Sequence, residues 1–362
     1  MLARRDALAL AATAALVPAA AAQTAPAPGA LDVVAEYEMQ GTGVACSHDG
    51  RIFVCFPRWE QEMPISVGEL KNGQFSPYPN AEWNAWRNAK HLDPKTHLIC
   101  VQSVTVDPQG YLWILDPAAP ATEFIIPDGP KLLKVDLKTD KVVQAIHFGM
   151  DTAPQGSYLN DVRVSADGRW AYLTDSGASS ALLVVDLRSG RIQRLLKDDP
   201  RTQPEPGVNV VVNGRAVVKP NGQKPQFGAD SLALSVDGKT VYWQALVGTK
   251  LYATDAASMQ AGRPSTRVVG PADIADGYWM ARDGRLYVTH PEDNSVRLRH
   301  ADGTLQVVAQ DPRLLWPDSM AEMPDGAILV TASDIQDMAQ WHDKGSTRTQ
   351  PYRLFRFQPP KA

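Results

Sequence analysis

The sequence predicts an all-β fold, a six-bladed β-propeller, on three observations. Six nine-residue segments align without gaps, and each ends in a glycine that is followed at once by an apolar run. A strand, an Asp-Gly-type turn and a second strand form the strongest short-range signal for a hairpin. The segments recur every 42 to 70 residues, and the 28 Pro and 26 Gly are spread along the chain, as is typical of many turns rather than long helices.

The six repeated segments each predict the innermost strand of a blade and the turn that follows it. They are residues 42–50, 102–110, 160–168, 230–238, 276–284 and 318–326. The second strands are RIFVCF, YLWILD, RWAYLTD, KTVYWQA, RLYVTH and AILVTA. Two weaker strands follow in the second to fifth repeats: KLLKVDL and KVVQAIHF, ALLVVDL and RIQRLLK, KLYATDA and TRVVG, SVRLRHA and TLQVVAQ. Four antiparallel strands per repeat indicate a propeller blade.

The sixth repeat offers only three strands, the last of which is PYRLFRF at residues 351–357. An unassigned strand, residues 32–39, lies near the N-terminus. We expect it to pair into the C-terminal blade as the outer strand and to close the ring, which removes exposed sheet edges. A β-sandwich with a second domain is the alternative, and six repeats in register argue against it.

The N-terminal 22 residues have the pattern of a secretory signal peptide. Arg4 and Arg5 precede an apolar run over 7–22 that ends in three alanines before Gln23. The run is shorter than the roughly 20 apolar residues of a membrane span, so an uncleaved anchor is the less favoured alternative. We expect a periplasmic or secreted protein, with twin-arginine export as one route, and no membrane contact after cleavage. Residues 23–31 then form a flexible leader, 32–358 one propeller domain and 359–362 a tail.

Composition excludes several classes of partner and site. Lys and Arg number 36 against 40 Asp and Glu without a basic block, so we expect no nucleic-acid partner. Three cysteines exclude every four-cysteine zinc module. Cys55 and Cys100 are both expected at strand ends near the same mouth of the propeller's central channel, so they are the feasible disulfide. Cys46 is expected at the opposite end of its strand. Three free buried thiols are the alternative.

One column of the repeat alignment is polar in all six blades, eight residues before each glycine. Because an innermost strand starts at one mouth of the channel, we expect this column to ring that mouth. A one-residue change of register would exchange Asn160 for Asp161. The column contains Thr42 and the five candidate ligand-binding residues Gln102, Asn160, Asp230, Asp276 and Asp318.

Carboxylates gathered in one small space raise each other's pKa. A bound cation or a cationic small molecule relieves that repulsion. The alternative is that these side chains only bind backbone N–H groups where the strands begin.

The chain resembles the yellow / major royal jelly protein family over almost all of residues 32–358. The similar stretches include GVACSHDGRIFVCFPRW, PYPNAEWNAW, SYLNDVRVSADGRWAYLTDSG and LLWPDSMAEMPDGAILVT. The resemblance implies a secreted six-bladed propeller. Bacterial members are often described as dopachrome-tautomerase-related, and some insect members bind biogenic amines or lipids in the channel.

A second, more distant resemblance is to SMP-30/gluconolactonase-like propellers, which hold a divalent cation in the channel. It implies that Asn160, Asp230 and Asp276 are metal ligands, with Ca²⁺, Mg²⁺, Mn²⁺ or Zn²⁺ as the candidate cofactor. This sequence has Thr42 where that family has a glutamate in the first blade, so one carboxylate ligand of the family pattern is missing.

These observations lead to four functional hypotheses. The first is a propeller that binds a small polar or cationic molecule at the channel mouth. The second is a metal-dependent hydrolase of lactones or esters, in which Asp230 is the candidate catalytic base. The third is a dopachrome-type tautomerase, and the fourth an interaction scaffold, for which the sequence identifies no protein partner. The role of the insert at residues 198–227, which is expected to cover one face of the ring, is open.

Overall fold

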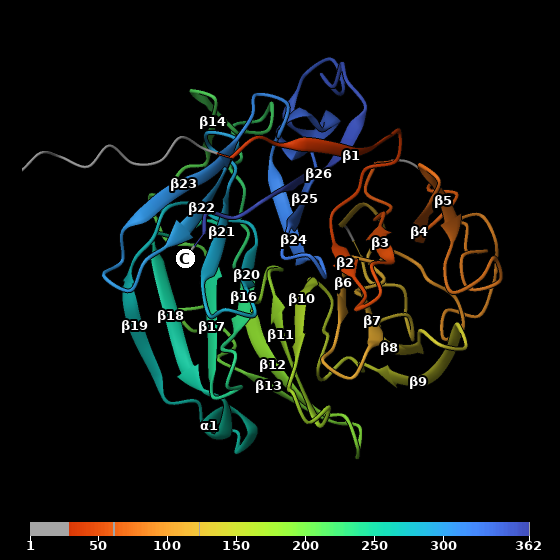
Figure 1. Ribbon diagram of the computed structural model, residues 1–362. Helices are drawn as coiled ribbons and strands as arrows, with labels where there is room; N and C mark the ends of the chain where they lie inside the picture. The colour runs from red at the N-terminus through yellow and green to blue at the C-terminus, as the bar shows by residue number, and fades with distance from the viewer. Residues whose placement is uncertain (1–28, 61, 123, 362) are drawn as a thin grey trace, which may run out of the picture.

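A computed structural model of the protein describes residues 29–60, 62–122 and 124–361, and the predicted signal peptide and most of the predicted leader lie outside them. Six four-stranded antiparallel sheets are arranged in a ring (Figure 1). The innermost strands contact one another in cyclic order, from the first blade round to the sixth and back to the first. The predicted six-bladed propeller is therefore confirmed.

Blades one to three follow the first half of the chain. Blade one consists of β2 (Val44–Cys46), β3 (Ile52–Cys55), β4 (Val67–Lys71) and β5 (Gln74–Pro77). Blade two consists of β6 (Ser103–Val106), β7 (Tyr111–Asp116), β8 (Lys131–Asp136) and β9 (Lys141–His147). Blade three consists of β10 (Leu159–Val164), β11 (Trp170–Asp175), β12 (Ala181–Asp186) and β13 (Arg191–Leu195).

Blades four to six follow the second half. Blade four consists of β16 (Ala229–Leu234), β17 (Thr240–Ala245), β18 (Lys250–Asp255) and β19 (Thr266–Pro271). Blade five consists of β20 (Tyr278–Met280), β21 (Leu286–His290), β22 (Ser295–Arg299) and β23 (Leu305–Gln310). Blade six consists of β24 (Pro317–Glu322), β25 (Ile328–Ala332), β26 (Tyr352–Phe357) and β1 (Asp32–Tyr37).

The N-terminal strand β1 is the outer strand of blade six, where it pairs antiparallel with β26. Tyr37 lies opposite Tyr352, and Asp32 lies opposite Arg356. The first and last described strands of the chain thus share one sheet, and Figure 1 shows β1 crossing beside β26.

Hydrophobic clusters fill the spaces between neighbouring blades. Val54 of blade one packs with Leu329 and Leu354 of blade six, and Trp113 of blade two packs with Leu173 of blade three. The glycines that close the six hairpins all have positive φ, from 67° to 89°, a backbone region that glycine enters without a steric penalty. Hairpin turns therefore set the register of every blade, as the sequence pattern predicts.

Several elements were not expected from the sequence. Blade one has two outer strands, β4 and β5, and a short helix α1 (Ala256–Gln260) joins β18 to β19. The insert contains a two-stranded sheet of β14 (Val211–Val212) and β15 (Arg215–Ala216). Three 3₁₀ turns are η1 (Pro120–Thr122), η2 (Ile335–Asp337) and η3 (Ala339–Trp341). In the described residues, none of the helices has the length and apolar character needed to cross a membrane.

Candidate functional site

A pocket of about 640 Å³ opens at one mouth of the central channel. A volume of this size suits a small organic molecule. All five residues predicted to ring the mouth line it: Gln102, Asn160, Asp230, Asp276 and Asp318. The sixth member of the polar column, Thr42, is buried and does not line the pocket, because its Oγ1 donates to the backbone oxygen of Gln102 at 3.1 Å.

Irregular pairing aims three of these side chains at the pocket. The register between the two inner strands shifts at Leu159–Val162 in blade three, at Ala229–Ser231 in blade four and at Pro317–Met320 in blade six. Each shift contains a site residue. A β-bulge redirects a side chain that regular alternation would place elsewhere. It is Asn160 that lines the pocket, whereas Asp161 forms an ion pair with Arg163 at 2.6 Å.

Short hydrogen bonds hold the polar side chains in place. Asn160 Nδ2 donates to Asp230 Oδ2 and to Ser176 Oγ, each at 2.9 Å. The indole of Trp316 donates to Asp276 Oδ2 at 2.5 Å. Asp318 accepts from Ser319 Oγ at 2.9 Å and from Ser333 Oγ at 3.0 Å. These partners are neutral, so the charge of the carboxylates is not cancelled within the site.

Burial changes the titration of all three carboxyls. It raises the pKa of Asp230 and of Asp276 well above the usual carboxyl value, and the charge of Asp318 raises both further. Burial also raises the pKa of Asp318, to about 6. Desolvation disfavours the ionised form of a carboxyl, and nearby carboxylates add repulsion. The three carboxyls, here called the acidic trio, therefore retain protons toward neutral pH when no cation is present.

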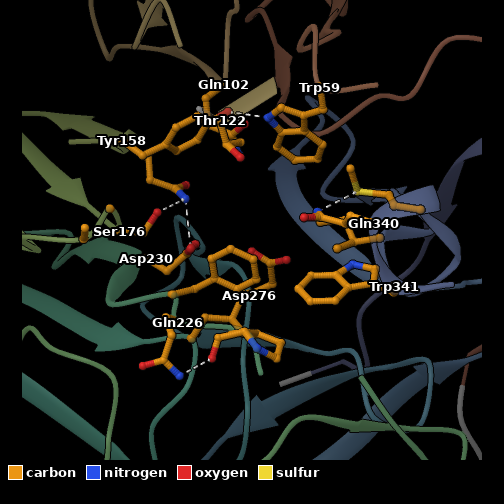
Figure 2. Close-up of a pocket in the computed structure, with 18 of the residues that line it drawn as sticks. Trp59, Gln102, Thr122, Tyr158, Ser176, Gln226, Asp230, Asp276, Gln340 and Trp341 are labelled. Atoms are coloured by element: carbon orange, nitrogen blue, oxygen red, sulfur yellow. Dashed lines mark hydrogen bonds between the residues drawn. The ribbon is translucent and has the colours of Figure 1, made fainter. Parts of the chain in front are cut away.

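Aromatic side chains form much of the rest of the wall: Trp59, Tyr158, Phe227, Trp316 and Trp341. Trp59 Nε1 donates to the Tyr158 hydroxyl at 2.6 Å, which in turn donates to Gln102 Oε1 at 3.0 Å. Figure 2 shows Asp230 and Asp276 between Tyr158 and Gln226, with Trp341 across the pocket from them. The pocket thus combines an acidic floor with flat apolar faces.

Two segments outside the repeats build the upper walls, and sequence reasoning missed their residues. The end of the insert contributes Lys219, Lys224 and Phe227, and the 3₁₀ turns before β26 contribute Met338 and Trp341. Neither segment has a strand-like pattern that ties it to a blade. The length of the insert between blades three and four predicts that it covers one face of the ring. It does not predict which of its residues line the pocket.

The expected disulfide between Cys55 and Cys100 is wrong for this structure, where all three cysteines are free and buried. Cys55 Sγ accepts the N–H of Gly43 at 3.2 Å and donates to the backbone oxygen of Gln102 at 3.1 Å. Cys100 packs instead with Trp86, Ile99 and Ala118 in another cluster. The position of a cysteine along its strand predicts how near it lies to the channel mouth, but the direction of its side chain depends on pairing across strands.

The residues expected to hold a divalent cation do not fit one. Within the described ranges, no group of three or more His, Cys, Asp or Glu side chains is placed to hold a metal ion. Asn160 directs its amide nitrogen toward Asp230, and Asp276 Oδ2 already accepts from Trp316. Ca²⁺ needs six to eight oxygen ligands. The raised pKa of Asp230 also favours its protonated form over the ionised base that the hydrolase alternative requires.

We therefore expect divalent cations to leave the stability of the mature protein unchanged. Protein stripped with EDTA and titrated with Ca²⁺, Mg²⁺, Mn²⁺ or Zn²⁺ should show no saturable shift in Tm. A specific site would add roughly 2.7 kcal/mol at a hundredfold excess over its Kd. A saturable shift that disappears in Asp230→Asn would contradict this prediction and restore the metal ligands Asn160, Asp230 and Asp276.

Comparison with protein families gives a match over most of the chain. A family model described as major royal jelly protein matches residues 99–351. A dopaminechrome tautomerase from Drosophila melanogaster is 29% identical over 163 residues, which are 41% of this chain and 34% of that protein. The match thus spans about a third of the length of this curated relative.

Solved structures share the fold at low sequence identity. A gluconolactonase from Xanthomonas campestris superposes with a TM-score of 0.57 at 14% identity, over 91% of this chain and 89% of its own. A calcium-binding protein, regucalcin, from Agrobacterium tumefaciens gives 0.56 at 15% identity, over 92% and 94%. At these identities the likeness extends to the propeller fold alone.

Proposed function

Because the chain belongs to the major royal jelly protein family, we propose that its mouth pocket binds a small aromatic amine. The observation that carries the proposal is the pairing of the acidic trio with an aromatic wall in one cavity. The trio forms no ion pair with a lysine or arginine anywhere in the described part of the chain. A buried acidic site without a basic partner is suited to a cation from solution.

The chemistry of an ammonium group matches the floor of the pocket. An ammonium donates up to three hydrogen bonds in different directions, and Asp230, Asp276 and Asp318 offer acceptors from three blades. A positive charge beside these carboxyls favours their ionised forms, so binding releases protons. The ring of the ligand then lies against Trp341 or Tyr158, where aromatic contact adds to affinity.

We also propose that the protein acts outside the cytoplasm. Its ligand would then be a small molecule of the periplasm or the surroundings, because the first 22 residues have the signal pattern described above. Western analysis of periplasmic and medium fractions, with an Arg4→Lys/Arg5→Lys variant to test the twin-arginine route, checks this placement.

A tautomerase is the second candidate, favoured by the unequal pKa values of the trio. Asp318, with a pKa of about 6, is the carboxylate that would take a proton from a ring carbon of an aminochrome. Asp230 or Asp276, whose pKa is raised further by the charge of Asp318, would return a proton to a quinone oxygen. The proton moves from carbon to oxygen, and no electron enters or leaves. The name of the Drosophila relative, dopaminechrome tautomerase, agrees with this candidate.

Tryptophan fluorescence titration tests the proposal, because Trp59, Trp316 and Trp341 line the pocket. Tyramine should bind saturably. Butylamine, which has the ammonium group but no ring, and phenol, which has the ring but no ammonium group, should each bind at least about tenfold more weakly. If tyramine fails to bind or binds no better than butylamine, the proposed function is wrong. If the protein accelerates the loss of dopaminechrome absorbance, it has tautomerase activity in addition to amine binding.

A further inference from the structure

The insert between blades three and four is packed over the channel mouth rather than extending into solvent. Val210, Val212 and Val217 form one hydrophobic cluster with residues of other blades. Their partners are Leu246, Val247, Ile274, Trp316, Ile335, Met338 and Trp341. Five of these partners also line the mouth pocket: Leu246, Trp316, Ile335, Met338 and Trp341. The insert is therefore part of the pocket wall.

Hydrogen bonds to blade five fix the small sheet of the insert. The Val211 N–H donates to Glu292 Oε1 at 3.0 Å, and the Asn213 N–H donates to the Glu292 backbone oxygen at 2.9 Å. Asn294 Nδ2 donates to Asn213 Oδ1 at 2.9 Å. Residues that follow this sheet are thus held at a defined position over the mouth.

Two lysines follow the anchored sheet and line the pocket, Lys219 half-buried and Lys224 exposed. A turn fixes the first, since the Lys219 N–H donates to the Gln223 oxygen at 2.8 Å. Some lysines elsewhere form ion pairs with carboxylates, such as Lys250 with Glu205 at 2.6 Å. Lys219 and Lys224 form no such ion pair within the ranges that the structure describes.

The charges around the pocket are therefore separated. The acidic trio forms its floor, and the two lysines stand on the side of the insert. The rim also has a carboxylate, Glu60, next to Trp59 in the chain. Figure 2 shows Trp59 across the pocket from Gln226, a residue of the insert. The side of the insert is thus positive, and the floor consists of carboxyls that become negative when a cation binds.

We infer that Lys219 and Lys224 form an anion subsite and that the ligand is an aromatic amine that also has a carboxylate. This inference rests on the proposed function. In an amino acid the ammonium and the carboxylate share one carbon. The ammonium group therefore meets the acidic trio, the carboxylate beside it turns toward the lysines on the side of the insert, and the ring lies against the aromatic wall. Lysine binds carboxylates as a compact charge with three donors. The subsite distinguishes an amino-acid-like ligand from the same amine without its carboxylate.

A matched pair of probes tests the subsite, L-tyrosine and tyramine, which differ only in the carboxylate. Their Kd values are measured by calorimetry for the mature wild type and for a Lys219→Gln/Lys224→Gln variant. We expect the variant to weaken L-tyrosine about tenfold and to leave tyramine unchanged or slightly tighter, since a repulsive charge is removed. The effect on L-tyrosine should shrink as salt is raised, because exposed charges are screened.

Lys239→Gln is the control, since Lys239 is an exposed turn lysine close to Asp237. It should change neither Kd. If the double variant weakens both probes equally or neither, the inference is overturned, while saturable tyramine binding keeps the proposed function intact. If the wild type binds neither probe, the proposed function is wrong and the inference falls with it.

Discussion

The Asp276→Asn variant is expected to bind tyramine roughly 100-fold more weakly than the wild type while unfolding at a higher temperature. Loss of a buried charge that faces a cationic partner typically costs several kcal/mol of binding energy. Asn is close in size, and its Oδ1 can still accept the Trp316 indole N–H that Asp276 Oδ2 accepts. The variant thus removes the charge and preserves the packing.

The rise in stability follows from the direction of the pKa shift. Burial, with the charges of Asp318 and Asp230, raises the pKa of Asp276 in the folded protein. A carboxyl whose folded pKa is raised stabilises the fold below its unfolded pKa, near 4, and this contribution is lost as pH rises toward the folded value. The wild type should therefore lose stability relative to Asp276→Asn between about pH 4 and 7. Urea unfolding at pH 4, 5.5 and 7 measures the difference.

Asp283 provides a matched control in the same blade. It closes the hairpin turn, where the side chain of Arg285 lowers its pKa. Asp283→Asn should leave tyramine binding unchanged and lower stability slightly, the opposite sign to Asp276→Asn. If Asp276→Asn binds tyramine like the wild type, or is less stable than the wild type at pH 7, the acidic trio is not a cation site.

The fold could be predicted from local sequence because each blade repeats the same inner hairpin, a strand, a turn that ends in glycine and a second strand. The glycine that ends each repeated segment has positive φ, so the hairpins and their register follow from turn chemistry and strand alternation. The pairing of β1 with β26 could be expected because one strand remained and one blade was incomplete. The alternation of side chains along a strand could not predict the direction of a side chain inside a β-bulge.

The site illustrates that limit. The polar column placed five residues at the mouth correctly, but the bulges that aim Asn160 rather than Asp161 into the pocket depend on pairing across two strands. The aromatic wall depends on the cluster that joins the insert to the turns before β26, a contact between segments more than 100 residues apart. The disulfide prediction was wrong for a related reason, since Cys55 turns toward Gly43 and Gln102.

Gly277 follows Asp276 directly, and Gly277→Ala is expected to destabilise the propeller by about 3 kcal/mol, in the upper range for overpacking a buried site. A Cβ on Gly277 would stand 2.0 Å from the backbone oxygen of Asp318, in the next blade. The Gly277 backbone cannot retreat easily, because its N–H donates to Thr289 Oγ1 at 2.7 Å and its oxygen accepts the Thr289 N–H at 3.0 Å. Denaturant unfolding at pH 7 measures the loss.

The same substitution should weaken tyramine binding, because relief of the clash must move blade five or blade six, each of which places one carboxyl of the acidic trio. Gly149→Ala is the control, since its Cβ would meet only the side chain of exposed Asp151, at 2.7 Å from Oδ1. That side chain can rotate away, so the expected cost is below about 1 kcal/mol. If the two alanine variants were equally stable, blades five and six would be able to move apart at the mouth without a loss in the free energy of unfolding. The close approach of Asp276 and Asp318 would then not be enforced by packing, and the acidic trio would have to be held together by its ligand.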